Sequence, residues 1–276
     1  MNKKRHVFWQ CLVAGAVALL VTTGHAPGQE TVDLIIKNGR IVDGSGKEAF
    51  TGDIAVRDGI IIEVGKMSAS KAQRIIDAKG RVVAPGFIDM MGQNSQILVS
   101  DRASAESKIR QGITTLLVGE GGSVAPRDAA RTAPAGFDKG WSSFAEYFRL
   151  LEEKRIPINV IHNVCEATLR WTVIGDKDED PTEEQLERMK GYVEQAMKDG
   201  CVGFSTALIY PPAAYAKTEE LVELAKVAGQ YNGVYFAHVR NESGQLLEAM
   251  EESVRIGREA EIAIHIYHLK AAGQDN

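Results

Sequence analysis

The sequence lacks several features that would point directly to a function. Its 276 residues carry a net charge of −5, only 7% of them are aromatic, and no basic patch with interleaved aromatic residues occurs. We therefore expect no nucleic-acid partner, because such proteins gather lysine and arginine on one face. The hydrophobic content of 44% is enough for one large domain, or for one domain with a small companion.

Cysteine is also scarce, with three residues in the whole chain. Cys11 lies in the N-terminal apolar run, which leaves Cys165 and Cys201 for the remainder of the chain. In an exported protein these two could form a disulfide. Both lie in or near apolar runs, however, so buried free thiols are the simpler interpretation.

Residues 1–28 have the layout of a secretory signal peptide. Lys3, Lys4 and Arg5 precede an uncharged apolar run at 7–21, and small residues follow it. The run is too short to span a membrane comfortably. We expect an exported protein, periplasmic or extracellular, with no stable membrane anchor after cleavage. An uncleaved anchor is the alternative.

Residues 29–85 predict a small antiparallel β domain. Asn38-Gly39 and Asp58-Gly59 each lie between apolar runs, and this arrangement is the strongest short-range signal of a β-hairpin. A unit of about 55 residues with few strands is only marginally stable alone. We therefore expect it to accompany a larger domain.

Residues 86–276 predict an α/β domain with a parallel sheet. Units of about 30 residues repeat, each with a strand that is apolar throughout, and such strands are buried on both faces by helices. A closed (β/α)8 barrel needs eight strands. The sequence indicates six strands, so we expect either an incomplete TIM-like barrel of about six βα units or an open sheet. The expected strands are 87–91, 113–118, 158–161, 201–206, 234–238 and 262–268.

Two of these strands end in histidine, at His238 and His268. Their interval corresponds to one β-α-β unit, so both imidazoles are expected to leave the same end of neighbouring parallel strands. Side-chain alternation places His268 on the face of Ile264, with Lys270 in phase beyond the strand end. His265 has the opposite phase and is assigned to the core or to helix packing.

Glu120 is the best candidate for a third ligand in this region. Two neutral imidazoles and one anion make a common catalytic zinc shell that leaves a position for water. Glu120 directly follows the strand 113–118 and lies between glycines, which would let the loop bring its carboxylate close. An exposed turn glutamate is the alternative. A phosphate-binding loop is excluded because Lys-Ser/Thr does not follow these glycines. His162, late in its strand, remains undecided.

Six segments resemble a known family. They are A-K-G-R-V-V-A-P-G-F-I-D (78–89), Q-G-I-T-T-L-L-V-G (111–119), G-F-S-T-A-L-I-Y-P-P-A (203–213), T-E-E-L (218–221), A-H-V-R-N-E-S (237–243) and Y-H-L-K-A-A-G (267–273). On these segments the sequence resembles the amidohydrolase superfamily, and within it the D-aminoacylase (N-acyl-D-amino-acid deacylase) family. The first segment is found across the superfamily. The third and the last two are specific to the D-aminoacylase branch.

The resemblance implies a metal-dependent hydrolase on a distorted (β/α)8 barrel, in which a metal activates water against an acyl carbonyl. It implies that His238 and His268 bind metal and that Lys270 binds the substrate carboxylate. It also implies that Tyr210 lies near the substrate. Arg240 matches a family arginine that would position the substrate or a loop.

The sequence departs from the family at several positions. Superfamily members follow P-G-F-I-D with H-x-H, a pair of metal ligands, and here Met91 and Gln93 stand in those places. The D-aminoacylase branch has a cysteine ligand in G-N-C-G where this chain has Glu120. The family's G-H-x-T-L-R is replaced by the segment 165–170, and its catalytic aspartate, on the eighth strand, would lie beyond Asn276.

The first two departures together suggest one metal instead of two. Loss of H-x-H removes one metal position, and Glu120, His238 and His268 keep the other. This arrangement is similar to that of mononuclear sugar-amide deacetylases in the superfamily. We therefore expect one divalent ion, with zinc as the expected metal.

The expected reaction is hydrolysis of a linear amide, such as an N-acyl amino acid of D configuration or a related small amide. One alternative is an exported binding protein of the same fold that has lost catalysis, which the loss of the histidine pair favours. The other is a hydrolase of cyclic amides. With two barrel strands and the aspartate absent, the 276-residue chain alone is expected to be poorly stable and inactive.

Overall fold

The structure, a computed structural model, describes residues 31–67, 71–92, 102–127 and 140–273. The segment interpreted as a signal peptide and Gln93 lie outside these residues. Contacts within the chain divide it into two compact units, Met1–Pro85 and Gly86–Asn276, and each is described by itself. Among the described residues, no helix is both long and apolar enough to cross a bilayer.

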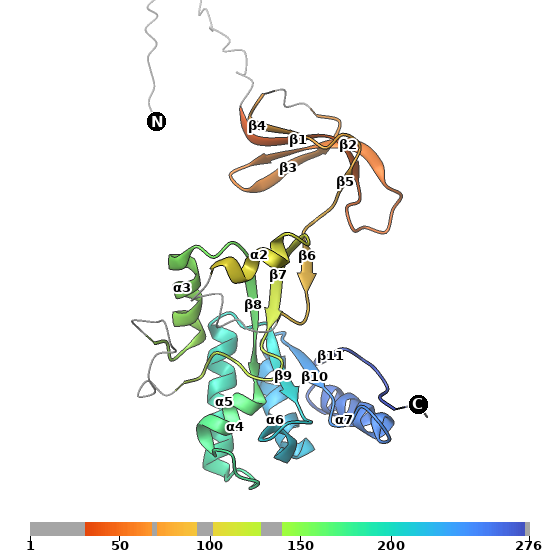
Figure 1. Cartoon of the computed structure of the whole chain (residues 1–276). Helices are drawn as coiled ribbons and strands as arrows, with labels where there is room; N and C mark the ends of the chain where they lie inside the picture. Colours follow the sequence, from red (N-terminus) through yellow and green to blue (C-terminus); the bar gives the residue numbers. More distant parts are fainter. Residues whose placement is uncertain (1–30, 68–70, 93–101, 128–139, 274–276) are drawn as a thin grey trace, which may run out of the picture. The chain divides into compact units, whose positions relative to one another are not determined.

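The first unit is a small five-stranded sheet (Figure 1). Its strands β1 to β4 are arranged in the order β3-β2-β1-β4, and β5 also pairs with β1. The pairs β1–β2 and β2–β3 are antiparallel, as expected, whereas β4 and β5 join β1 in parallel. The strands are β1 (Val32–Ile41), β2 (Phe50–Arg57), β3 (Ile60–Gly65), β4 (Ala72–Asp77) and β5 (Val82–Val83).

One of the two predicted hairpin turns forms. Asp58 and Gly59 have positive φ angles of 51° and 74° and connect the antiparallel strands β2 and β3. The prediction at Asn38-Gly39 was wrong, because β1 runs straight through this dipeptide. The register with β2 shifts between Ile36 and Gly39, so the left-handed Asn38 (φ 56°) belongs to a β-bulge.

The second unit contains a curled sheet of six parallel strands in the order β11-β10-β9-β8-β7-β6. The six predicted strands are therefore confirmed, with β6 and β11 at the two edges. They are β6 (Phe87–Asp89), β7 (Ile113–Val118), β8 (Asn159–Cys165), β9 (Gly203–Ala207), β10 (Val234–His238) and β11 (Ala263–Ile266).

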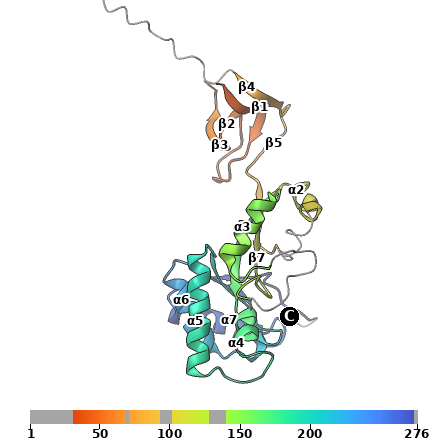
Figure 2. The same cartoon turned by 90° about the vertical axis from the view of Figure 1, so that its left-hand side faces the viewer.

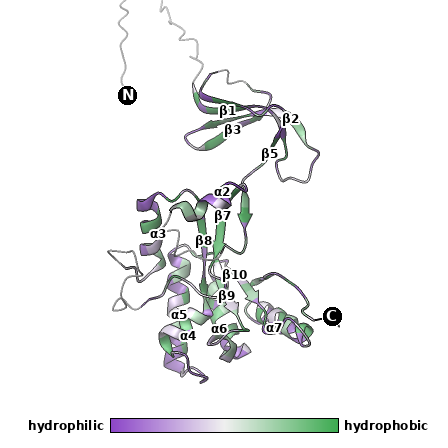
Figure 3. Cartoon of the chain, viewed as in Figure 1, coloured by the Kyte–Doolittle hydropathy of each residue, from purple (hydrophilic) through white to green (hydrophobic). Residues whose placement is uncertain are grey.

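Helices cover the outer face of this sheet, and α4, α5, α6 and α7 pack side by side in that order (Figures 1 and 2). Hydrophobic residues are concentrated on the strands, while the helices combine hydrophobic and hydrophilic residues (Figure 3). The helices are η1 (Arg102–Ala105), α2 (Glu106–Ile109), α3 (Phe144–Lys154), α4 (Glu166–Val173), α5 (Glu183–Lys198), η2 (Ala213–Tyr215), α6 (Thr218–Gly229) and α7 (Leu246–Glu259).

Two apolar clusters lie on opposite faces of the sheet. The large outer cluster joins the strands to the helices and includes Phe204, Tyr235 and Ile262. The small inner cluster consists of Leu117, Phe236 and Tyr267, with Met91, Ile161 and Val234 packed against it. The carboxyl ends of the parallel strands lie just beyond this inner cluster, which is where side chains of a barrel-like sheet form a site.

Candidate metal centre

Glu120, His238 and His268 come together at the carboxyl ends of three parallel strands. Glu120 lies two residues after β7, His238 is the last residue of β10, and His268 lies two residues after β11. Glu120 and His238 are buried, with 7% and 6% of their surface exposed, and His268 is half-buried.

The three side chains have distances close to those of ligands of one ion. Glu120 Oε1 lies 3.0 Å from His238 Nδ1 and 2.9 Å from His268 Nε2. The two imidazole rings are perpendicular, with centroids 4.4 Å apart. Tetrahedral zinc with bonds of about 2.0–2.1 Å keeps its ligand atoms about 3.3 Å apart. A shift of a few tenths of an ångström would therefore admit one ion, so the three residues form a candidate metal site.

The loop that carries Glu120 is tightly held. Gly119 has φ 105°, and a Cβ atom there would lie 2.5 Å from the carbonyl oxygen of Asn163, so only glycine fits. The Ser205 hydroxyl donates to the carbonyl of Gly119, and the Cys165 thiol donates to the carbonyl of Glu120 over 3.2 Å. These contacts fix the backbone from which the Glu120 carboxylate projects.

His268 reaches the site by a different route from the one predicted. Register pairs Phe236 with His265, and their rings lie 5.3 Å apart, so His265 lies on the inner face. Ile264 packs against the outer cluster instead. The prediction that His268 shares the face of Ile264, and that His265 points away, was therefore wrong. β11 ends at Ile266, and a left-handed turn with φ 30° at His268 brings its ring to Glu120.

Lys270 and Tyr210 line the cavity over the three residues. Lys270 is half exposed and pairs with Glu242 at 2.5 Å. The Tyr210 ring stands perpendicular to His238, with centroids 5.6 Å apart. The cavity has a volume of about 650 Å³ and is lined by Met91, Gly119, Glu120, Gly121, Gly122, Ala207, Tyr210, His238, Glu242, His268 and Lys270.

Sequence reasoning missed Glu242, although it lies in the motif 237–243. Its Oε1 lies 3.0 Å from His268 Nδ1 and 3.6 Å from His238 Nε2. Burial raises the pKa of Glu242, but the hydrogen bond from Lys270 and the nearby positive charges outweigh it, so the pKa is lowered overall. The available signal was its position in the loop after β10, four residues beyond His238.

Arg240 does not line the cavity, and its donors are engaged elsewhere. Its guanidinium donates to the Glu252 carboxylate and to the carbonyl groups of Ala214 and Ala216, over 2.8–3.0 Å. These contacts hold the η2 turn against α7. They are the contacts expected of a loop-positioning arginine.

The end of β6 contributes an apolar side chain to the site. Met91, at a position where the sequence resemblance implied a metal ligand, packs against the inner cluster and lines the cavity. Asp89, two residues earlier, is bound to Lys108 at 2.6 Å and accepts from the Met91 amide. Neither Asp89 nor Met91 joins the cluster of Glu120, His238 and His268 found among the described residues.

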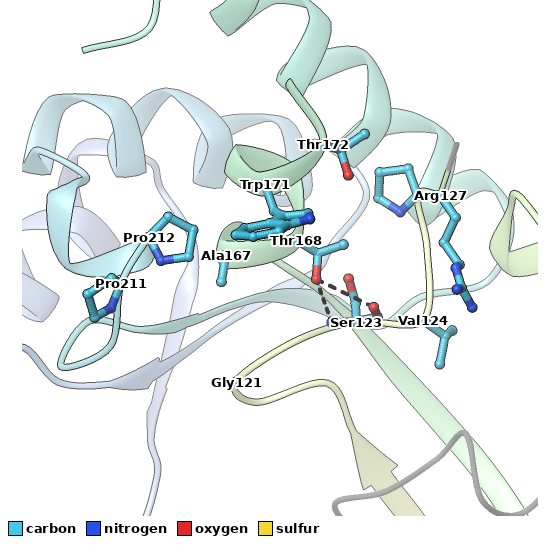
Figure 4. A pocket seen from close by; sticks show the side chains of 11 residues that line it. Gly121, Ser123, Val124, Arg127, Ala167, Thr168, Trp171, Thr172, Pro211 and Pro212 are labelled. Carbon is cyan, nitrogen blue, oxygen red and sulfur yellow. Dashed lines mark hydrogen bonds between the residues drawn. The ribbon is translucent and has the colours of Figure 1, made fainter. Parts of the chain in front are cut away.

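A second pocket of about 560 Å³ adjoins the first, and the two share Gly121. Figure 4 shows its lining, which includes Trp171 and Thr168 of α4. The Thr168 hydroxyl accepts from the amide of Ser123 over 2.8 Å. This contact anchors the far end of the Glu120 loop to α4.

His162, which the sequence left undecided, and the two cysteines are buried and do not line the cavity. Cys165 and Cys201 are both buried free thiols, as expected. His162 is fully buried, donates from Nδ1 to the carbonyl of Asn163 over 2.7 Å, and packs edge-on against Phe144. It is therefore part of the outer core. Burial lowers the pKa of His162 from 6.5 to about 4.

His162 should make the protein acid-sensitive. The unfolded chain takes up a proton near pH 6.5 and the folded chain only near pH 4, so stability is lost as pH falls through this interval. The expected loss is about 3 kcal/mol of the free energy of unfolding. Urea denaturation between pH 7 and 4 should show this slope in the parent protein and a smaller one in His162→Gln. If the free energy of unfolding depended on pH in the same way in both proteins, the lowered pKa of His162 would be contradicted.

Comparison with known proteins shows what this architecture is similar to. No protein-family model matches the chain. The chain is 37% identical to a D-aminoacylase from Alcaligenes xylosoxydans xylosoxydans over 251 residues, which are 88% of this chain and 52% of that protein. The resemblance inferred from the sequence motifs is thus confirmed.

Two solved structures of the same family are also similar to this chain. N-acyl-D-glutamate deacylase from Bordetella bronchiseptica, complexed with zinc and a phosphonate mimic of the tetrahedral intermediate, has a TM-score of 0.82 and 36% identity. The match covers 90% of this chain and 53% of that one. A D-aminoacylase structure has a TM-score of 0.81 and 35% identity. It comes from work on the binuclear metal centre of that enzyme, on one-metal activation and second-metal attenuation. That match covers 89% and 53% of the two chains. The chain therefore spans about half the length of these relatives.

Proposed function

We propose that the protein hydrolyses the amide bond of an N-acyl amino acid of D configuration, because this chain belongs with the D-aminoacylases among the amidohydrolases. The observation that carries the proposal is the meeting of Glu120, His238 and His268 at one end of a parallel sheet, beneath a cavity. Lys270 and Tyr210 stand at the rim of the same cavity.

Glu120, His238 and His268 would hold one divalent ion, and we propose zinc. One carboxylate and two imidazoles are a frequent catalytic zinc set, and a related deacylase has been crystallised with zinc. Such an ion supplies Lewis-acid polarisation of the carbonyl and lowers the pKa of water. The apolar packing of Met91 supports one ion in place of two.

Lys270 would bind the carboxylate of the substrate. Its ammonium faces the cavity from the turn after β11, and it is half exposed. A substrate carboxylate would share this ammonium with Glu242. The Tyr210 ring would border the same space opposite His238.

Met91 also favours a second candidate, a binding protein of the same fold without catalysis. An apolar residue fills a position where the superfamily has a metal ligand. Metal content and hydrolysis, measured on the same samples, distinguish the two functions.

The test uses the full-length protein, with metal content from elemental analysis and hydrolysis of N-acetyl-D- and N-acetyl-L-amino acids. We expect one metal per chain and a preference for the D series. Glu120→Ala should weaken metal binding more than about 100-fold, since a ligand contributes more than an outer-shell partner. Glu120→Cys, which restores the cysteine of the D-aminoacylase branch, should keep the metal.

Glu251→Ala serves as the matched control, because Glu251 is an exposed glutamate on α7. The proposal fails if the protein binds no stoichiometric metal, or if Glu120→Ala binds it as tightly as the parent does. Stoichiometric metal with no hydrolysis in either series would establish the binding protein instead.

A further inference from the structure

We propose that Glu242 is a positioning residue whose carboxylate selects the tautomers of His238 and His268, so that the nitrogens facing Glu120 stay unprotonated. This inference rests on the metal site of the proposed function. It gives a role to a carboxylate that neither the motifs nor the ligand set explains.

Each imidazole lies between two carboxylates. His268 directs Nε2 at Glu120 over 2.9 Å and Nδ1 at Glu242 over 3.0 Å. His238 directs Nδ1 at Glu120 over 3.0 Å and Nε2 at Glu242 over 3.6 Å. A neutral imidazole carries one N–H, and only its other nitrogen can bind a metal. The carboxylate that accepts the N–H therefore decides whether the Glu120 side is able to bind.

His238 shows what Glu242 offers. Its Nε2 is buried and has no hydrogen-bond partner within the part of the chain that the structure describes. Glu242 Oε1 is 3.6 Å away, and a movement of about half an ångström would make a hydrogen bond of ordinary length. With the proton on Nε2, His238 Nδ1 is available beside Glu120. Metal-bound histidines commonly donate their second N–H to a carboxylate in this way.

Lys270 acts on His268 in the opposite direction. Its Nζ lies 3.0 Å from His268 Nδ1. An ammonium group can only donate, so alone it favours an unprotonated Nδ1 and places the proton on Nε2, where a metal would have to bind. Glu242 accepts from Lys270 and lies equally close to Nδ1. The Glu242 carboxylate can therefore accept hydrogen bonds from Lys270 and from His268 Nδ1 at the same time, so that His268 Nε2 stays unprotonated.

The loop around Glu242 does not need this carboxylate for its conformation. Asn241 Oδ1 accepts from the amide of Ser243 over 2.8 Å and from the amide of Gln245 over 3.3 Å. The turn after β11 is tied down by the backbone carbonyl of Glu242, which accepts from the Ala272 amide over 2.6 Å. These bonds would persist in a side-chain variant, so the Glu242 carboxylate is directed at the two histidines and Lys270.

The test measures zinc affinity by chelator competition and tautomers by ¹⁵N NMR of the metal-free protein. Glu242→Ala should bind zinc about 10- to 100-fold more weakly, and the proton of His268 should move from Nδ1 to Nε2. Glu242→Gln keeps an acceptor oxygen and should lose less affinity. Adding Lys270→Met to Glu242→Ala removes the competing donor and should restore most of the loss. Glu251→Gln, an exposed change on α7, should match the parent.

Two results would overturn the inference. One is unchanged zinc affinity in Glu242→Ala. The other is a loss that Lys270→Met does not relieve, with unchanged tautomers, since a merely structural role predicts that outcome. The NMR measurement needs no metal, so it separates this inference from the proposed function. If Glu120→Ala kept its metal while the tautomers shifted in Glu242→Ala, the proposed ligand set would be wrong and the inference about Glu242 would stand.

Discussion

Replacing Arg170 with methionine should lower the free energy of unfolding by about 3 to 5 kcal/mol. Arg170 is fully buried and pairs with Glu220 at 2.6 Å, while its Nη2 donates to the carbonyl of Glu179 over 2.7 Å. The substitution keeps most of the volume but leaves the Glu220 carboxylate buried without its cation. An uncompensated buried charge is far more costly than the pair itself.

Urea denaturation near pH 7 measures this effect. Arg255→Met is the matched control, because Arg255 on α7 is half exposed and pairs with Glu219 of α6 and Glu259 of α7. Its loss should cost less than about 1 kcal/mol. A double variant, Arg170→Met with Glu220→Leu, should recover part of the stability because no unpaired charge remains. Equal stabilities of Arg170→Met and Arg255→Met would show that the buried pair is not important.

Glu166→Gln should remove a loss of stability of about 5 kcal/mol that accumulates as the pH rises from 4.5 to about 8. Glu166 is fully buried at the start of α4, and neither of its carboxylate oxygens has a hydrogen-bond partner among the described residues. Burial raises its pKa from 4.5 to about 8, and the charge of Glu220 adds to the rise. Arg170 Nη1 lies 2.6 Å from Glu220 Oε2, whereas its Nε is 3.8 Å from Glu166 Oε1, so Glu166 is the member of the group that stays neutral at pH 7.

The direction of the pH dependence follows from the raised pKa. Between pH 4.5 and about 8 the folded chain holds a proton that the unfolded chain has released, so stability falls as pH rises. The difference in free energy of unfolding between Glu166→Gln and the parent should therefore grow from pH 5 to 9. The exposed change Glu251→Gln should follow the parent at every pH. A constant difference for Glu166→Gln would exclude the buried neutral carboxyl.

The sheet of the second unit could be predicted because largely apolar runs recur about every 30 residues with helical segments between them, as in repeated βα units. The first unit shows a limit of local sequence signals, which do not distinguish a hairpin turn from a β-bulge. Asn38-Gly39 and Asp58-Gly59 carry the same turn signal, and both dipeptides begin with a left-handed residue. One forms a hairpin turn and the other a bulge, because both accommodate such a residue. The choice depends on which strand pairs with β1.

The candidate site was predicted in part. Glu120 and His238 lie where their strands end, so strand boundaries and alternation were enough to suggest them. His268 joins Glu120 and His238, but not through the strand alternation that predicted it, because its position depends on a turn that strand periodicity does not describe. Glu242 was missed because its contacts join the loop after β10 to the turn after β11. Contacts between loops have no period in the sequence.

The contacts of Arg240 connect the rim of the cavity to the outer surface of the protein. Glu252 on α7 accepts from Arg240, Arg240 holds the carbonyl of Ala214, and the Ala214 amide in turn donates to the carbonyl of Tyr210. The position of an aromatic ring at the cavity thus depends on a carboxylate on an outer helix. Substitutions on that helix can therefore alter the cavity while every residue that lines it stays unchanged. The size of the cavity thus depends on residues of the outer helical layer as well as on its own lining.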